Sequence, residues 1–189
     1  DIDHVEPFPK EIEAAYYLLH SMGGLVANLK EEEESLASNF ITLIEKTNCK
    51  QIIFLSGIIE EEESLSPHLH SRLSVEKILK NSSIPCTILR SSIIIGAGSA
   101  SFEIIRDLVE ILPLMIAPKW VKNFCQPISI SDVLFYLCAV LLNANCYHHT
   151  YDIGGPQAIT FKEVLMRYAK FRKLKRYIID VPVLTPRLS

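Results

Sequence analysis

Residues 66–76 read Ser66-Pro67-His68-Leu69-His70-Ser71-Arg72-Leu73-Ser74-Val75-Glu76. A serine is a favourable helix N-cap and a proline suits the first helical position, so this stretch predicts a helix over residues 67–80. It follows the apolar run Gln51-Ile52-Ile53-Phe54-Leu55-Ser56-Gly57 and precedes a β-branched run from Cys86 to Ile95. Both runs predict buried strands, and a strand, a helix and a second strand in this order predict a parallel pair.

The same alternation extends outward from this unit. Further strands are predicted near residues 14–19, 150–153 and 176–181. Helices are predicted near residues 31–47 and 101–112, and from Ser129 or Ser131 to about residue 142. A last helix is predicted after Thr160, where Glu163 completes a capping box. Strands that alternate with helices of this length indicate a Rossmann-like, doubly wound α/β fold with helices on both faces of a parallel sheet. We expect Tyr16–Leu19, Ile52–Leu55 and Thr87–Leu89 to be adjacent parallel strands.

Composition narrows the classes of function. With 189 residues and a net charge of −3, the chain predicts one globular domain with no surface for nucleic acid. The apolar run over residues 133–142 is about half of the roughly 20 residues that a membrane span needs, so no membrane association is expected. The acidic runs 31–34 and 60–63 are interpreted as solvated surface. The five cysteines form no CxxC pair, and no signal peptide is visible, which together favour a cytoplasmic protein.

Two other patterns have competing interpretations. Gly96-Ala97-Gly98-Ser99-Ala100-Ser101 follows a strand and opens a helix, as a dinucleotide-binding GxGxxG loop does, but Ser101 replaces the third glycine. A structural loop that lines a pocket beside the sheet is the favoured interpretation. His148 and His149 are adjacent and would face opposite ways in an extended segment, so no metal site is expected.

Several motifs, in this order, resemble the short-chain dehydrogenase/reductase superfamily, and more narrowly its atypical, NmrA-like branch of predicted nucleoside-diphosphate-sugar epimerases. The resemblance covers nearly the whole chain. The motifs are Tyr17-Leu18-Leu19-His20-Ser21-Met22, Ser66-Pro67-His68-Leu69, Gly98-Ser99-Ala100-Ser101-Phe102-Glu103, Pro118-Lys119-Trp120-Val121, Pro127-Ile128 with Asp132-Val133, and Gly154-Gly155-Pro156 with Thr160 and Glu163.

The resemblance implies a nicotinamide cofactor, NAD or NADP, and a catalytic set of Ser56, His68 and Arg72. His68 and Arg72 stand where the superfamily has Tyr and Lys. The imidazole of His68 can exchange protons near neutral pH, whereas Arg72 stays charged and would bind a ribose hydroxyl or a phosphate. The alternative is a surface His and Arg in the early turns of a helix. With Arg72, cofactor contacts are expected from His20, Ser21, Ser56, Ser91 and Ser92, at or just past strand carboxyl ends.

The superfamily's N-terminal glycine-rich strand and loop have no counterpart in this sequence, so dinucleotide binding is expected to be poor. The resemblance implies an oxidoreductase or nucleoside-diphosphate-sugar epimerase acting on a small-molecule substrate. The alternatives are a non-catalytic dinucleotide-sensing or scaffold protein, and a fragment with only a structural role. Residues 1–189 would form one Rossmann-like domain, incomplete at its N-terminus, with substrate-side segments near 96–126 and 154–189. Carbonyl reduction should be weak, and a homo-oligomer is possible.

Overall fold

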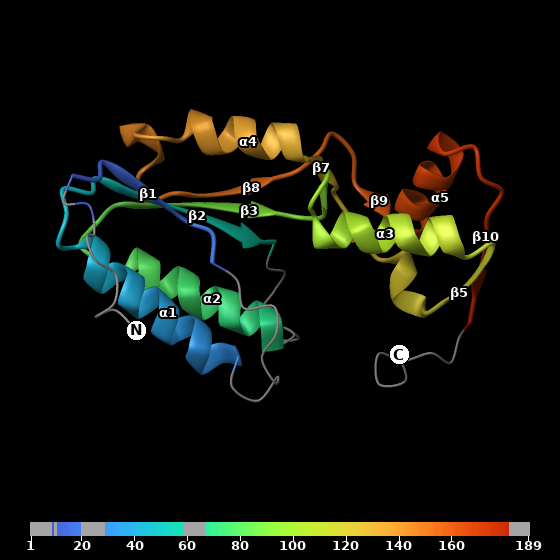
Figure 1. The fold of residues 1–189 in the computed structure, drawn as a ribbon, viewed down its shortest axis with the longest axis horizontal. Helices are drawn as coiled ribbons and strands as arrows, with labels where there is room; N and C mark the ends of the chain where they lie inside the picture. The colour runs from blue at the N-terminus through green and yellow to red at the C-terminus, as the bar shows by residue number, and fades with distance from the viewer. Residues whose placement is uncertain (1–8, 10, 20–28, 59–66, 182–189) are drawn as a thin grey trace. The chain divides into compact units, whose positions relative to one another are not determined.

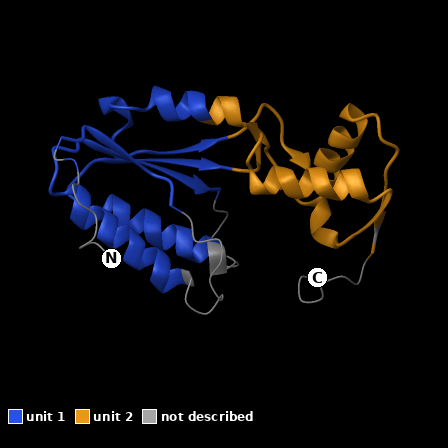
Figure 2. Ribbon diagram, viewed as in Figure 1, with its two compact units in different colours: residues 1–91, 134–153 blue, residues 92–133, 154–189 orange. Residues whose placement is uncertain are grey.

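The computed structural model describes residues 9, 11–19, 29–58 and 67–181 (Figure 1). The chain divides into two compact units (Figure 2). Unit 1 consists of Asp1–Ser91 and Leu134–Ile153, and unit 2 of Ser92–Val133 and Gly154–Ser189. Both segments that were expected on the substrate side fall in unit 2, while the grouping of the whole chain into one domain stays a prediction.

Unit 1 is built on a four-stranded parallel sheet. Its strands are β1 (Ala14–Tyr17), β2 (Gln51–Gly57), β3 (Cys86–Ser91) and β8 (Thr150–Ile153), in the spatial order β1-β2-β3-β8. The register pairs Tyr17 with Phe54 and Ser56 with Arg90. The prediction of three adjacent parallel strands is therefore confirmed, although the first strand ends at Tyr17 rather than at Leu19. All four carboxyl ends lie at the same edge of the sheet, because the strands run in one direction.

Helices cover both faces of this sheet (Figure 1). α1 (Leu29–Ile44) and α2 (Pro67–Lys80) lie on one face, and α4 (Ile130–Ala139), whose residues from Leu134 onward belong to unit 1, lies on the other. The core between the sheet and the first two helices is apolar and contains Ala15, Tyr17, Ala37, Ile44, Ile52, Phe54, Val75, Leu79, Cys86 and Ile88. The Rossmann-like α/β class is thus confirmed, and α2 has the predicted bounds.

A buried amide ties the sheet to the end of α4. Gln51 is fully buried, and its Nε2 donates to Thr87 Oγ1 at 2.8 Å and to the Val140 carbonyl at 2.9 Å. Its Oε1 accepts from the Leu142 N–H at 2.6 Å. The polar atoms of this side chain are therefore satisfied without water, as burial requires.

Unit 2 packs two helices on short strands. The helices are α3 (Ala100–Ile111) and α5 (Phe161–Phe171), and η3 (Lys119–Lys122) is a 3₁₀ turn. β5 (Leu114–Ala117) pairs with β10 (Tyr177–Asp180) in parallel, as β4 (Ile94–Ile95) does with β7 (Ile128–Ser129), and β6 (Phe124–Cys125) pairs with β9 (Ile159–Thr160) in antiparallel. The core of this unit contains Ile105, Val109, Val121, Leu165 and Ala169.

The start of α5 is the predicted capping box. The Thr160 Oγ1 accepts from the Glu163 N–H at 3.2 Å, and the Glu163 carboxylate accepts from the Thr160 N–H at 2.8 Å. The bond from the Thr160 N–H, followed by one from the Thr160 hydroxyl, lowers the pKa of Glu163. Two donors at the helix start that lack intrahelical partners are satisfied in this way.

Across the residues that the structure describes, no helix is both long and apolar enough to cross a bilayer.

Candidate functional site

The hydroxyl of Ser56 is a buried polar group of unit 1 without a described hydrogen-bond partner. The residue lies at the carboxyl end of β2 and is only 4% exposed. Among the described residues its Oγ has no hydrogen-bond partner. A buried hydroxyl without a partner is costly, since it gives up its bonds to water and gains none in return. Such a group is more often kept for a ligand than for the stability of the fold.

Arg72 reaches the same edge of the sheet from α2. The residue is buried, at 9% exposure, and its Nη1 lies 3.4 Å from the Leu19 carbonyl oxygen, just after β1. Its guanidinium carbon lies 5.9 Å from the centroid of the Phe54 ring. Burial lowers the pKa of Arg72, and the nearby Glu33 charge opposes that shift. The surface His and Arg alternative is therefore wrong for Arg72.

Strand periodicity connects Ser56 with Arg72. Side chains alternate along a strand, so Ser56 is on the same face of β2 as Phe54, two residues earlier. Phe54 belongs to the core between the sheet and the two helices α1 and α2, and Arg72 lies over its ring. The fold therefore places an unpartnered hydroxyl and a buried cation on one face, toward the ligand-binding edge of an open parallel sheet.

A buried acid on α1 completes the polar set. Glu33 is 3% exposed, and its carboxylate accepts a hydrogen bond from the Ser71 Oγ. Burial, followed by the charge of Glu33, raises the pKa of Tyr17 to about 12. The interpretation of residues 31–34 as solvated surface is wrong for Glu33, because α1 turns this one acid inward, while residues 60–63 lie outside the described residues. The burial of Glu33 results from the packing of α1 against α2, which the sequence pattern does not show.

The other expected contacts have mixed outcomes. Ser91, at the end of β3, is buried, and its carbonyl accepts from the Ile58 N–H at 3.0 Å. Ser92 belongs to unit 2, where its Oγ accepts from the Gln126 N–H at 3.3 Å. His20 and Ser21 lie outside the described residues. The backbone of His68 is in the first turn of α2, one turn before Arg72, but its side chain lies outside the described part of the structure. Of the expected residues, unit 1 thus places Ser56 and Arg72 on the same face of the sheet. Ser91 follows Arg90, which pairs with Ser56 and contacts α2, so its side chain is on the opposite face. The roles of these residues stay predictions.

The glycine-containing loop before α3 serves packing and turn geometry. Gly98 has a φ of 80°, which favours glycine, and a Cβ on Gly96 would lie 2.4 Å from Ile130 Cγ2. Ser99 caps α3, accepting from the Phe102 N–H at 3.4 Å and donating to the Ile94 carbonyl at 2.7 Å. The N-terminus of α3 is capped by the loop itself, which supports the structural interpretation of this segment.

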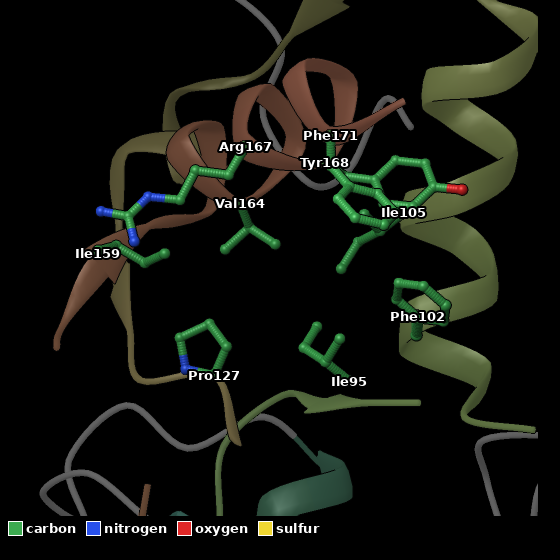
Figure 3. Close-up of a pocket in the computed structure, with 9 residues that line it drawn as sticks. All are labelled: Ile95, Phe102, Ile105, Pro127, Ile159, Val164, Arg167, Tyr168 and Phe171. Carbon is green, nitrogen blue, oxygen red and sulfur yellow. The ribbon is translucent and has the colours of Figure 1, made fainter. Parts of the chain in front are cut away.

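Unit 2 contains a separate cavity of about 330 Å³ (Figure 3). Its wall is apolar and is formed by residues of β4, α3, β9 and α5 together with Pro127. Ile95 and Phe102, which flank the glycine-containing loop, line the cavity, whereas residues 96–101 of the loop do not. The expectation that the loop lines a pocket beside the sheet stays a prediction. In the described residues no three His, Cys, Asp or Glu side chains are grouped to hold a metal ion.

No protein family and no curated protein matches the sequence, whereas several solved structures share its fold. RMD from Pseudomonas aeruginosa, complexed with NADPH, has a TM-score of 0.79 and 13% identity over 98% of this chain and 74% of that chain. UDP-glucuronic acid 4-epimerase from Bacillus cereus, in complex with NAD, has a TM-score of 0.71 and 17% identity over 90% of this chain and 62% of that chain. A short-chain dehydrogenase/reductase superfamily protein from Agrobacterium tumefaciens, with bound NAD, has a TM-score of 0.68 and 13% identity over 96% of this chain and 70% of that chain.

This chain spans less than two thirds of the length of several such structures, including the Bacillus cereus epimerase at 62%. At these identities the likeness is one of fold, and it agrees with the Rossmann-like sheet of unit 1. The narrower resemblance to the NmrA-like branch and the missing glycine-rich loop stay predictions.

Proposed function

We propose that the chain binds a nicotinamide dinucleotide, NAD or NADP, at the carboxyl edge of the unit 1 sheet, as a protein of the short-chain dehydrogenase/reductase type. The observation that carries this proposal is the unpartnered, buried Ser56 hydroxyl at the end of β2. The fold is that of structures determined with NAD or NADPH, which supports the same class of cofactor.

The residues at this edge fit such a ligand. The Ser56 Oγ is free to donate to a carbonyl or carboxamide oxygen, and the Arg72 guanidinium has several donors, of which one faces the Leu19 carbonyl. Those donors match ribose hydroxyls or a phosphate. A bound nicotinamide supplies or accepts a hydride. Ser56 would contact the nicotinamide carboxamide and orient a substrate oxygen beside it, and Arg72 would hold the negative or hydroxyl-rich part of the cofactor.

The substrate class follows from the same comparison. One solved structure of this fold is a UDP-glucuronic acid 4-epimerase, and another, MoeE5, was determined in complex with UDP-glucose and NAD. We therefore propose a small-molecule substrate, with nucleoside-diphosphate sugars as the first class to test. An oxidoreductase or an epimerase is the corresponding activity.

A non-catalytic dinucleotide-sensing or scaffold protein is the second candidate. It is favoured by the composition of α2, which contains no tyrosine between Pro67 and Lys80. In the superfamily that this chain resembles, a lysine lowers the pKa of such a tyrosine, and Arg72 stands at the lysine position. A guanidinium stays charged and cannot pass on a proton. His68 is the remaining proton donor one turn before Arg72.

Binding is tested by NADPH and NADH fluorescence with the full chain. The Ser56→Ala and Arg72→Gln variants should each weaken binding about five- to fiftyfold, because each loses a buried polar contact to the ligand. Lys77→Gln is the matched control, since Lys77 is exposed on the same helix. Binding that is unchanged in both variants would exclude this edge as the site.

Turnover separates the two candidates. Nucleotide oxidation is followed with carbonyl substrates, and epimerisation of UDP-sugars, which consumes no nucleotide, is followed by chromatography of the sugar products. Both assays compare His68→Ala with the unaltered chain. We expect carbonyl reduction to be weak and to change little, because an imidazole is shorter than a phenol and a donor must come within about 3 Å. A loss of about 10²–10⁴-fold with unchanged nucleotide affinity would instead establish His68 as a general acid and the chain as an enzyme.

A further inference from the structure

The unit 2 cavity has the size of a ligand site but a wall that excludes sugars. Its volume of about 330 Å³ falls in the range of small-molecule pockets. The side chains around it in Figure 3 include Ile95, Ile105, Ile159 and Val164, which offer no hydrogen bond. Hydroxyl groups placed there would lose their bonds to water without replacement. The cavity therefore suits an apolar part of a ligand, such as an aliphatic chain or an aromatic ring.

The aromatic side chains of the cavity are held in fixed positions. The rings of Phe102 and Tyr168 pack edge to face, with their centroids 5.7 Å apart. The Tyr168 hydroxyl donates to Glu110 Oε1 at 3.1 Å and points away from the cavity in Figure 3. The ring rather than the hydroxyl of Tyr168 therefore faces a ligand, and the apolar character of the wall is retained.

Among the described residues that line the cavity, Arg167 alone carries a charge. It lies on α5, one turn after Glu163, and is exposed. The Glu163 carboxylate is already engaged by the Thr160 N–H at 2.8 Å and the Thr160 Oγ1 at 3.0 Å. The charge of Arg167 contributes to lowering the pKa of Glu163, but among the described residues no hydrogen bond or ion pair occupies the Arg167 guanidinium. Its donors are available to an anion at the mouth of an apolar cavity.

We propose that this cavity binds a small amphipathic anion, with an aliphatic or aromatic body in the cavity and a carboxylate on Arg167. A medium-chain carboxylate such as octanoate has this chemistry. The site is formed by residues of unit 2 alone and does not rest on the proposed dinucleotide site of unit 1. It also differs in class from a nucleoside-diphosphate sugar, whose hydroxyls and phosphates the apolar wall disfavours.

The test is a calorimetric titration of the full chain with octanoate and with 1-octanol. Octanoate should bind about three- to tenfold more tightly than octanol, since only the anion contacts Arg167. Arg167→Gln should abolish that preference and leave octanol binding unchanged. Lys170→Gln, on the same helix and exposed, is the matched charge control and should retain the preference. An equal loss in both variants would overturn the anion site.

A cavity-filling substitution tests the apolar part. Val164→Phe should weaken both ligands at least tenfold, whereas Ile111→Phe, at an exposed position of α3, should leave them unchanged. Methyl NMR of the unaltered chain gives a result that does not depend on the folding of a variant. Octanoate should shift the methyl resonances of Ile95, Ile105 and Val164 but not that of Ile52 in the unit 1 core. Unshifted cavity methyls at saturating octanoate would overturn the proposal.

Discussion

Arg90 and Glu76 form a two-bond ion pair that joins the end of β3 to α2. The Nε of Arg90 donates to Glu76 Oε1 at 2.9 Å, and its Nη2 donates to Oε2 at 2.6 Å. The Glu76 side chain is only 2% exposed, while that of Arg90 is 21% exposed. The hydrogen bond with Glu76 raises the pKa of Arg90. Among the described residues, the buried Glu76 carboxylate is therefore paired with Arg90 alone, and this pair holds α2 against β3.

Removal of that arginine should be costly. In Arg90→Met the Glu76 charge stays buried without its partner, and we expect the free energy of unfolding to fall by about 3 kcal/mol or more. The double variant Arg90→Met/Glu76→Leu should recover most of this loss, because no buried charge remains. Urea unfolding followed by circular dichroism measures both. If the single and double variants were equally stable, the ion pair would not be what holds α2.

The orphaned hydroxyl of Ser56 predicts a gain in stability. Ser56→Ala removes a buried donor that has no described partner, so the free energy of unfolding should rise by about 1 kcal/mol. Thr87→Val is the contrasting variant on the neighbouring strand. The Thr87 hydroxyl accepts from Gln51 and donates to the Cys146 carbonyl at 2.8 Å, so its removal should destabilise the chain. Urea unfolding of both variants that gave changes of the same sign would contradict this prediction.

Tyr17 predicts a loss of stability at alkaline pH. The fold raises the pKa of this phenol from 10.0 to about 12, mainly through burial. Since the folded chain disfavours the phenolate, the contribution of Tyr17 is fully present below pH 10 and is lost as the pH rises through about 12. Tyr17→Phe keeps the ring against Phe40 and Phe54 and cannot ionise. The urea midpoint of the variant should fall less than that of the unaltered chain between pH 9 and 11.5. Parallel curves would show that the fold does not raise the pKa of Tyr17.

Gly155 predicts a backbone requirement in unit 2. A Cβ on Gly155 would lie 2.2 Å from the carbonyl oxygen of Pro127, which also accepts from the Gly155 N–H at 3.1 Å. Backbone cannot move aside as a flexible side chain can, so Gly155→Ala should cost about 2 kcal/mol or more. Gly98→Ala, at a φ of 80° in open space, should cost only about 1 kcal/mol. Thermal unfolding distinguishes the two, and an equal cost would refute the close approach.

Local signals predicted the regular elements well. The helix at 67–80, the capping box at Thr160 and the apolar strands of unit 1 each depend on neighbouring residues, so a sequence pattern is sufficient to find them. The strands β4, β6, β7 and β9 have two residues each, which is too short for any periodicity to show.

The candidate site was predicted less completely, because its contacts are long-range. Arg72 was singled out by the resemblance, which aligns it with the lysine of the superfamily, whereas the burial of Glu33 results from the packing of α1 on α2. Glu76 lies on the same helix, four residues after Arg72, but its pairing with Arg90 is set by the register of β3. That the Ser56 hydroxyl has no described hydrogen-bond partner can be recognised only when all neighbouring atoms are placed.

The division of the chain into units has a consequence for how such a protein can be altered. The backbone passes from one unit to the other at residues 91–92, 133–134 and 153–154, so neither unit is one continuous segment. A truncation after residue 91 would remove β8, the strand that pairs with β3, along with the rest of the chain. Homologous exchange at a single crossover would likewise create hybrid units rather than swap a whole one. Inheritance of either unit intact therefore requires joins at all three boundaries, and engineered chimaeras should be cut at all three together.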